Sequence, residues 1–512
     1  MNKSKKPDPM TNEIISNIKK FRDEIHPTFD ARNDAAMNLL DALSSNTSAK
    51  SAMDLSLNPL FQRNYCSLTR VVSEFYSGLS SIQEKNNDFT RIISRYCPPL
   101  KTRQFHLFGA DCTPNPRPFS PTQEDRGFIY VANRLRSNKP IDIGHKYSVT
   151  AYLPEKDKDS PPWIIPLACA RVSTSEKGTM VGLNQINYCL SQESFKDQLC
   201  VSVLDSEYSS HECLTEIKKN KNHVGIMRLK SNRTVYLPPD PVAPNEPKKG
   251  PPKKFGRKLK LQDFKDEASS KKTAPEADSE PKLETEIPLT PEPWPEPSDK
   301  KTISSFNKRG EEIKIKILSW DDILMRDKRG SDLSDTPMRL IRVAHSKKDS
   351  EEELFEKPIW LIVYGKRCQE LSLEDIFYSY KQRFDLEHFY RFGKNRLLMD
   401  RFQTPDCQHE EAWWQLVILS YVQLYLARGL ASYIFKPWEK YAAKDAKSEP
   451  IMSPTQVQRS FTAISTRIGT PAKNSKGHRK AWGRKKGELQ TKRPRHPVVK
   501  KEKKPQPSVL QV

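Results

Sequence analysis

The chain of 512 residues has no apolar stretch long enough to cross a lipid bilayer, which takes about 18–20 consecutive residues. Its most apolar stretch, residues 413–426, contains Gln415 and Gln423 and is typical of a buried core helix. The basic N-terminus is not followed by an apolar segment, so we expect no secretion signal. These absences favour a cytoplasmic protein without a membrane partner.

Paired cysteines are also missing. The nine cysteines are scattered, and none forms a Cys-x-x-Cys pair, which argues against a disulfide framework and a structural zinc site. Glycine is scarce, with 18 residues against 40 prolines. A hydrophobic fraction of 36% and a mean hydropathy of -0.75 are low for a compact enzyme, so part of the chain is expected to be unpacked.

Positive charge is what the sequence has in excess. It contains 86 Lys and Arg against 64 Asp and Glu, a net charge of +22, which favours a polyanionic partner such as a nucleic acid. Residues 471–504 contribute +12 of this charge, from 14 Lys or Arg minus two Glu. Such a stretch predicts salt-sensitive phosphate affinity that does not depend on base sequence.

Shifts in composition and in apolar period divide the chain into segments, and together they predict an α/β fold. The first segment has three- and four-residue apolar steps, and the second has strands followed by alternating strands and helices. The third contains 14 of the 40 prolines, between Pro238 and Pro297, ahead of a period-two strand at 312–320. The predicted segments are an N-terminal helical module that is a candidate for DNA binding (1–100), the first part of the core (101–230), an insertion (231–370) that is Pro-rich and disordered at 238–300 and then β-rich, the helical second part of the core (371–445), and a basic, largely disordered tail (446–512).

Two aspartates, Asp111 and Asp205, each end an apolar strand. Ligand sites in α/β sheets tend to lie at the carboxyl ends of strands, which makes both residues site candidates. The alternative for either residue alone is a turn or a helix cap.

A third element is the predicted helix at 372–394, with Ser372 and Asp375 in capping-box positions. At about 100° per residue, one narrow stripe of this helix carries a phenol, a carboxylate and several cations. A carboxylate can bind a divalent metal, and cations with a phenol can hold phosphates, whereas the alternative is a solvated helix face with a weak ion pair. The stripe consists of Tyr380, Arg383, Glu387 and Lys394, with Arg391 beside them.

The spacing Tyr-x2-Arg-x3-Glu-x6-Lys of this helix resembles the signature of DDE-type insertion-sequence transposases. The resemblance covers about residues 20 to 430, and Cys112 departs from it at a position where many relatives carry a small or β-branched residue. Four flanking stretches also resemble the family, namely 107–113 around Asp111, 138–148, 203–208 around Asp205, and 409–415.

The resemblance implies a ribonuclease-H-like core with a mixed sheet, interrupted by the β-rich, partly disordered insertion. In such a core Asp111 lies on the first strand, Asp205 on the fourth and Glu387 on a late helix. The three carboxylates would be catalytic and would bind two Mg²⁺ ions, for which Mn²⁺ can substitute, because hard oxygen ligands select these metals. Contacts to DNA phosphates are then expected from Tyr380, Arg383, Arg391 and Lys394.

The activity that the resemblance implies is cut-and-paste DNA transposition by hydrolysis and transesterification of phosphodiesters. Its expected partners are the terminal inverted repeats of the element, target DNA and a second copy of the chain. Two alternatives stay open: a catalytically inactive, repurposed DNA-binding protein, and a structure-selective nuclease on the same fold.

Other residues carry weaker signals. His145 could approach the metal site, but a structural histidine is the favoured interpretation. Trp294 could stack on an extruded base, but an incidental tryptophan in a disordered segment is favoured. Asp125 and Arg126 are expected to form a local ion pair.

Overall fold

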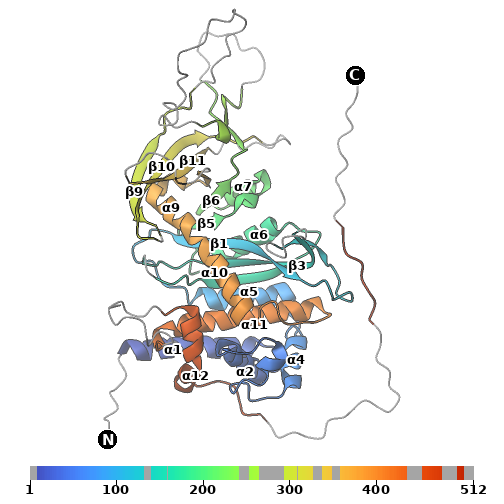
Figure 1. The fold of residues 1–512 in the computed structure, drawn as a ribbon. Helices are drawn as coiled ribbons and strands as arrows, with labels where there is room; N and C mark the ends of the chain where they lie inside the picture. Colours follow the sequence, from blue (N-terminus) through green and yellow to red (C-terminus); the bar gives the residue numbers. More distant parts are fainter. Residues whose placement is uncertain are drawn as a thin grey trace, which may run out of the picture. The chain divides into compact units, whose positions relative to one another are not determined.

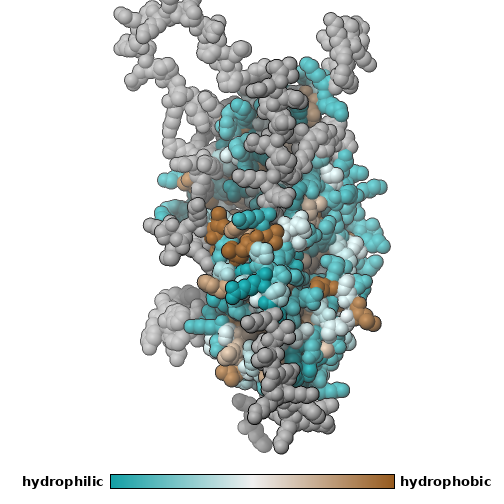
Figure 2. Space-filling view, turned by 90° about the vertical axis from the view of Figure 1, so that its right-hand side faces the viewer, coloured by the Kyte–Doolittle hydropathy of each residue, from teal (hydrophilic) through white to brown (hydrophobic). Residues whose placement is uncertain are grey.

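A computed structural model describes residues 9–131, 140–157, 160–240, 253–264, 293–307, 309–326, 337–348, 354, 358–434, 452–475 and 493–500. These residues form a mixed α/β fold, as predicted (Figure 1). The chain divides into two compact units: unit 1 comprises Met1–Lys196 with Phe384–Val512, and unit 2 comprises Asp197–Arg383. No helix among the described residues is long and apolar enough to cross a membrane. The described surface visible in Figure 2 is mostly hydrophilic, with small hydrophobic groups between.

Unit 1 contains a helical core built from both ends of the chain. Buried Arg22 joins three helices, because its guanidinium donates to both carboxylate oxygens of Asp41, at 2.5 and 2.9 Å, and to Gln423 Oε1 at 2.6 Å. The N-terminal helices therefore share one core with later helices. The helices are α1 (Pro9–Ile25), α2 (Asn33–Ser44), α3 (Ala52–Leu55), α4 (Tyr65–Ser73), α5 (Ile82–Ser94), α10 (Phe384–Arg396), α11 (Cys407–Ala427) and α12 (Pro454–Ile468).

The sheet of unit 1 is antiparallel. Strand β3 (Ile141–Tyr152) pairs with β1 (His106–Pro116) on one edge, and with β2 (Gly127–Tyr130) and β4 (Ile165–Val172) in succession on the other. Helix α6 (Gly178–Leu190) packs on β1, β3 and β4, and α5 and α11 pack on β4. Helix α6 thus covers three of the four described strands of unit 1, including β1.

Unit 2 contains mostly antiparallel strands in the order β5-β6-β12-β11-β10-β9. Its first two strands are parallel and are linked through α7 (His211–Lys219). Helix α9 (Leu373–Gln382) begins with the predicted capping box of Ser372 and Asp375. The strands are β5 (Cys200–Leu204), β6 (His223–Leu229), β9 (Asp299–Phe306), β10 (Glu312–Ile323), β11 (Met338–Lys347) and β12 (Ile359–Tyr364), with a separate pair of β7 (Thr234–Tyr236) and β8 (Lys258–Lys260).

Three sequence predictions need correction. The helix expected at 372–394 is two helices, because α9 ends at Gln382 and α10 begins at Phe384. Helix α12 lies within the segment expected to be a disordered tail, and buries Val457, Phe461 and Ile464. Residues 253–264 and 293–300 of the Pro-rich segment are ordered and include β8, while 241–252 and 265–292 lie outside the described residues.

Candidate active site

The predicted site residues are distributed over both units. The stripe expected on one helix spans two helices, since α9 belongs to unit 2 and α10 to unit 1. Unit 1 holds Asp111, Glu387, Arg391 and Lys394, and unit 2 holds Asp205, Tyr380 and Arg383.

In unit 1, helix α10 lies directly against strand β1 (Figure 1). A Cβ atom at Gly109 would lie 2.7 Å from Leu386 Cδ1, so glycine at this position lets the helix approach the strand. One turn later, the Tyr390 hydroxyl donates a hydrogen bond to the backbone carbonyl of Asp111 at 2.8 Å. These two contacts fix α10 at the strand residue that carries the first predicted carboxylate.

Lys394 makes the third contact of α10 with β1. Its Nζ donates to Thr113 Oγ1 at 2.7 Å and to the carbonyl oxygen of Pro114 at 2.9 Å. Burial lowers the pKa of the Lys394 ammonium, and Asp400 acts in the opposite direction. The Lys394 ammonium is therefore bound to β1 within unit 1.

Two carboxylates flank this contact. Asp111 is half-buried, and its Oδ1 accepts a hydrogen bond from the backbone N–H of Cys112 at 2.8 Å. Glu387 is exposed. In an ideal helix, its side chain projects about 60° around the helix axis from that of Tyr390. Cys112 alternates to the opposite face of β1, where its Sγ packs against Gly178 at the start of α6. Cys112, the residue that departs from the family pattern, thus lies on the opposite face of β1 from Asp111.

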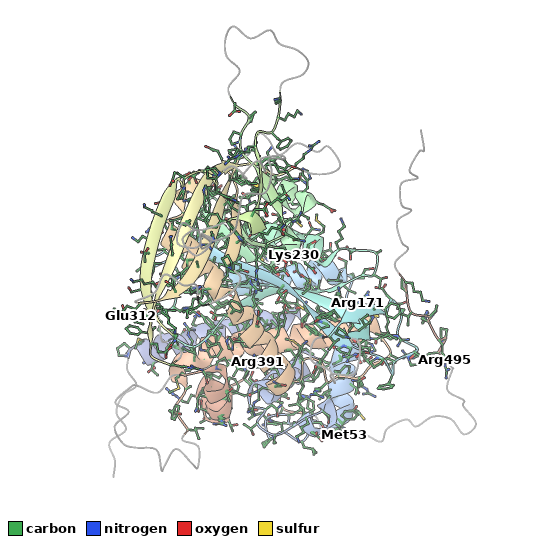
Figure 3. All side chains as sticks on the ribbon, turned by 45° about the horizontal axis from the view of Figure 1, so that its top comes forward. Met53, Arg171, Lys230, Glu312, Arg391 and Arg495 are labelled. Carbon is green, nitrogen blue, oxygen red and sulfur yellow. The ribbon has the colours of Figure 1, made fainter. Side chains whose placement is uncertain are left out.

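Arg391 continues the exposed side of α10. It is exposed one turn beyond Glu387 and is labelled in Figure 3. The neighbouring carboxylate Asp385 is instead buried and paired with Lys156 at 2.6 Å. On α10, Glu387 and Arg391 are therefore exposed, whereas Asp385 is buried.

Unit 2 forms its own polar group at the end of β5. Asp205 is half-buried and caps a 3-10 turn, accepting a hydrogen bond from the Glu207 backbone N–H at 2.9 Å. Burial raises the pKa of Tyr380; the cations of Arg383 and Arg228 act to lower it, and Asp205 acts to raise it. Tyr380 therefore lies close enough to Asp205, Arg383 and Arg228 to interact with each of them electrostatically.

Within this group, the Arg383 guanidinium lies 5.7 Å from the centre of the Tyr380 ring. Arg228 is exposed on β6, and the sequence analysis missed it. Only the fold brings Arg228 to Tyr380, because 152 positions separate them and no motif includes Arg228.

Buried Glu410 organises a second polar network in unit 1. Its Oε2 accepts from Arg117 Nε at 2.7 Å and from Gln123 Nε2 at 2.9 Å. Its Oε1 accepts from the Tyr147 hydroxyl at 2.9 Å and lies 3.0 Å from His145 Nδ1. Burial alone would raise the pKa of Glu410, but these partners lower it to about 2.

Arg117 extends this network to the segment that follows α10. Arg117 also donates to the backbone carbonyls of Asp400 and Phe402 at 3.1 Å, which holds the segment after α10. His145 is buried, and its Nε2 lies 3.0 Å from the carbonyl oxygen of Glu124. His145 is thus a structural histidine, the interpretation that the sequence favoured.

Two weaker expectations are wrong. Asp125 does not pair with Arg126: it binds Arg171 Nη1 at 2.5 Å, whereas Arg126 donates to the Arg117 carbonyl. Trp294 is not an incidental residue of a disordered segment. Its ring packs in unit 2 at 5.2–5.6 Å from the rings of Phe264, Trp320 and Trp360.

The ligand chemistry of the predicted carboxylates suits Mg²⁺ or Mn²⁺. Asp111 and Glu387 in unit 1, and Asp205 in unit 2, offer hard oxygen donors, which these ions prefer over thiophilic metals. Within the part of the chain that the structure describes, no three His, Cys, Asp or Glu side chains are grouped so that they could hold a metal ion.

A family model described as DDE superfamily endonuclease matches residues 24–287, slightly more than half of the chain. The matched residues include Asp111 and Asp205, whereas Glu387 lies beyond them. No curated protein matches the chain. The mixed α/β fold, with antiparallel β1, β3 and β4 in unit 1 and parallel β5 and β6 in unit 2, is consistent with the predicted ribonuclease-H-like class. The chain belongs to the DDE superfamily endonucleases.

Proposed function

We propose that this endonuclease is a DNA transposase that cleaves DNA at the ends of its own mobile element and joins the ends to a target. The packing of α10 on β1 supports this proposal, because Glu387 is exposed on α10 and Asp111 lies on β1. Family membership supports cleavage of a nucleic acid, and the net charge of +22 supports a polyanionic substrate.

Asp111, Asp205 and Glu387 are the proposed catalytic residues. Two divalent ions bound by these carboxylates would neutralise charge on the scissile phosphate and activate a water molecule or a 3′-hydroxyl. These carboxylates contribute hard oxygen ligands, from the end of β5 for Asp205, from β1 for Asp111 and from α10 for Glu387. Their positions on regular secondary structure limit the movement of the three side chains. Mg²⁺ is the proposed cofactor, with Mn²⁺ as a substitute.

The cations of the signature are proposed to hold DNA phosphates. Arg391 is exposed beside Glu387, and Arg383 lies against the Tyr380 ring, which limits the rotamers available to its guanidinium. Charge-assisted hydrogen bonds from guanidinium groups to phosphates are among the stronger polar contacts in proteins. Lys394 has three N–H donors, of which two bind β1, and the third is proposed to bind a DNA phosphate.

Transposition also requires that two element ends be held together. We therefore propose that the chain binds the terminal inverted repeats and acts as a homodimer. The stretch at 471–504, with its charge of +12, supplies affinity for phosphates but no base recognition.

The test uses a plasmid that carries the encoding gene with its native flanking DNA, incubated with the purified full chain and a second, target plasmid. The proposal predicts Mg²⁺-dependent excision and joining by the wild-type chain, and loss of both in Asp111→Asn, Asp205→Asn and Glu387→Gln. Asp142→Asn is a matched control: Asp142 is half-buried in the same sheet, and its Oδ1 accepts the next residue's N–H at 2.8 Å, as that of Asp111 does.

Each alternative gives a different result. Cleavage without joining indicates a nuclease, and DNA binding without cleavage indicates a repurposed binding protein. Cleavage retained in any of the three carboxylate variants contradicts the assigned site.

A further inference from the structure

We infer that Thr113 and Lys394 form a latch between β1 and α10, and that Thr113 is a positioning residue for DNA cleavage. The inference rests on the proposed function, because it concerns the placement of Asp111. Thr113 is 6% exposed and lies two residues after Asp111 on the same face of β1. Its hydroxyl accepts a hydrogen bond from Lys394 Nζ at 2.7 Å.

The latch is the last of three contacts that follow one another along both elements. Leu386 packs on Gly109, Tyr390 binds the carbonyl of Asp111, and Lys394 binds Thr113. Eight helical residues rise about 12 Å, and four strand residues rise about 13 Å. The helix and the strand therefore advance by nearly the same distance between the first contact and the third.

This match determines where Asp111 stands. The strand is held before Asp111 by apolar packing, at Asp111 through its own carbonyl, and after Asp111 by the latch. A sliding of β1 along α10 would disturb the contacts of Lys394 Nζ with Thr113 and Pro114, which are 2.7 and 2.9 Å long. Catalytic groups must be held to about 0.5 Å, so the loss of one contact can impair chemistry without unfolding the site.

The latch also connects this strand to DNA. An ammonium group has three N–H donors, and two of those of Lys394 are directed at β1. The third can bind a phosphate oxygen, so one side chain would contact both the substrate and the strand of Asp111. In contrast, Thr113 is buried, so we expect its side chain to make no direct contact with DNA.

The test compares three threonine variants of the full-length chain. Thr113→Val removes the hydroxyl and keeps the shape, and Thr113→Ser restores the hydroxyl. The matched control is Thr150→Val: Thr150 is fully buried on β3 of the same sheet, and its hydroxyl donates to Gln185 Oε1 at 3.2 Å. The measurements are the single-turnover cleavage rate, the Mg²⁺ concentration for half-maximal rate, the DNA Kd without divalent metal, and the Tm.

We expect Thr113→Val to cleave about ten- to a hundred-fold more slowly, in line with the loss of a hydrogen bond to a charged group. It should also need more Mg²⁺ and bind DNA as the wild type does, while Thr113→Ser recovers the rate. Thr150→Val should share any fall in Tm but keep the wild-type Mg²⁺ requirement.

Two results would overturn the inference. One is wild-type cleavage and Mg²⁺ requirement in Thr113→Val; the other is an equal loss of rate in Thr113→Val and Thr150→Val, which would show a general effect of stability. If the wild-type chain itself shows no Mg²⁺-dependent cleavage, the proposed function fails, and this outcome is distinct from both.

Discussion

Replacing Glu410 with glutamine should destabilise unit 1 by about 3 kcal/mol or more. The carboxylate is 1% exposed and has donors at both oxygens, including Arg117 and Tyr147. A glutamine amide keeps one acceptor oxygen, but its NH₂ group would face two of these donors. A fall in the pKa of Glu410 from its usual 4.5 to about 2 corresponds to roughly 3 kcal/mol at neutral pH, since each pH unit is worth about 1.36 kcal/mol.

The sign of the pH dependence follows from the lowered pKa of Glu410. The folded state binds a proton on this carboxyl more weakly than the unfolded state, so the stabilisation is fully present above about pH 4.5 and is lost as the pH falls toward 2. Urea unfolding of the full chain, followed by tryptophan fluorescence at pH 7 and in steps down to pH 3, measures this. Trp414 is a suitable probe because it stacks on Tyr147, with ring centres 4.0 Å apart.

Glu411→Gln is the matched control for this prediction. Glu411 is adjacent in sequence and accepts from Arg171 Nε at 2.9 Å, but burial raises its pKa, and Arg171 offsets this only in part. Its ionised form therefore does not stabilise the fold in the way that of Glu410 does, and we expect a smaller loss. An unchanged urea midpoint in Glu410→Gln at pH 7, or equal losses in the two variants, would refute the reasoning.

Three further predictions concern packing. Gly109→Ala places a Cβ atom 2.7 Å from Leu386 Cδ1, so we expect a loss of about 1–3 kcal/mol in thermal unfolding and slower DNA cleavage; a variant with normal cleavage and an unchanged Tm would contradict this. Arg22→Leu leaves the Asp41 carboxylate buried without its cation and should cost about 3–5 kcal/mol in urea unfolding, and a loss below 1 kcal/mol would show that the pair is dispensable. Trp294→Ala removes a half-buried ring and should cost about 2 kcal/mol in urea unfolding; an unchanged urea midpoint would contradict this.

Local signals made much of the fold predictable from sequence. The period-two alternation at 312–320 corresponds to β10, and the apolar run before Asp205 corresponds to β5. The capping box of Ser372 and Asp375 is present as predicted, with both hydrogen bonds formed. In each case neighbouring residues in the chain determine the structure, so the pattern contains enough information.

Structural features that depend on residues far apart in the sequence could not be predicted. Glu410 lies 265 positions from His145 and 293 from Arg117, so no local pattern links the network. Helix α12 has a Ser453-Pro454 start and apolar residues at three- and four-residue steps, but the strongly basic residues that follow it dominated the composition of that segment. The break between α9 and α10 at Arg383 could not be predicted from the sequence either, because no proline or glycine lies next to it.

The division of the signature between two helices changes what its spacing means. A continuous helix would explain Tyr-x2-Arg-x3-Glu-x6-Lys as one face aimed at one substrate. With a break at Arg383, Tyr380 lies on α9, Arg383 lies between the two helices, and the Glu-x6-Lys spacing belongs to α10 alone. Seven helical residues separate Glu387 from Lys394 by about 10 Å, close to the rise of three strand residues. Since Lys394 binds Thr113 and Pro114, this spacing places Glu387 alongside residues 109–111 of β1. The six-residue interval between Glu387 and Lys394 therefore matches a distance along α10 to a distance along β1. A one-residue insertion between Glu387 and Lys394 should abolish cleavage even though it leaves every signature residue present.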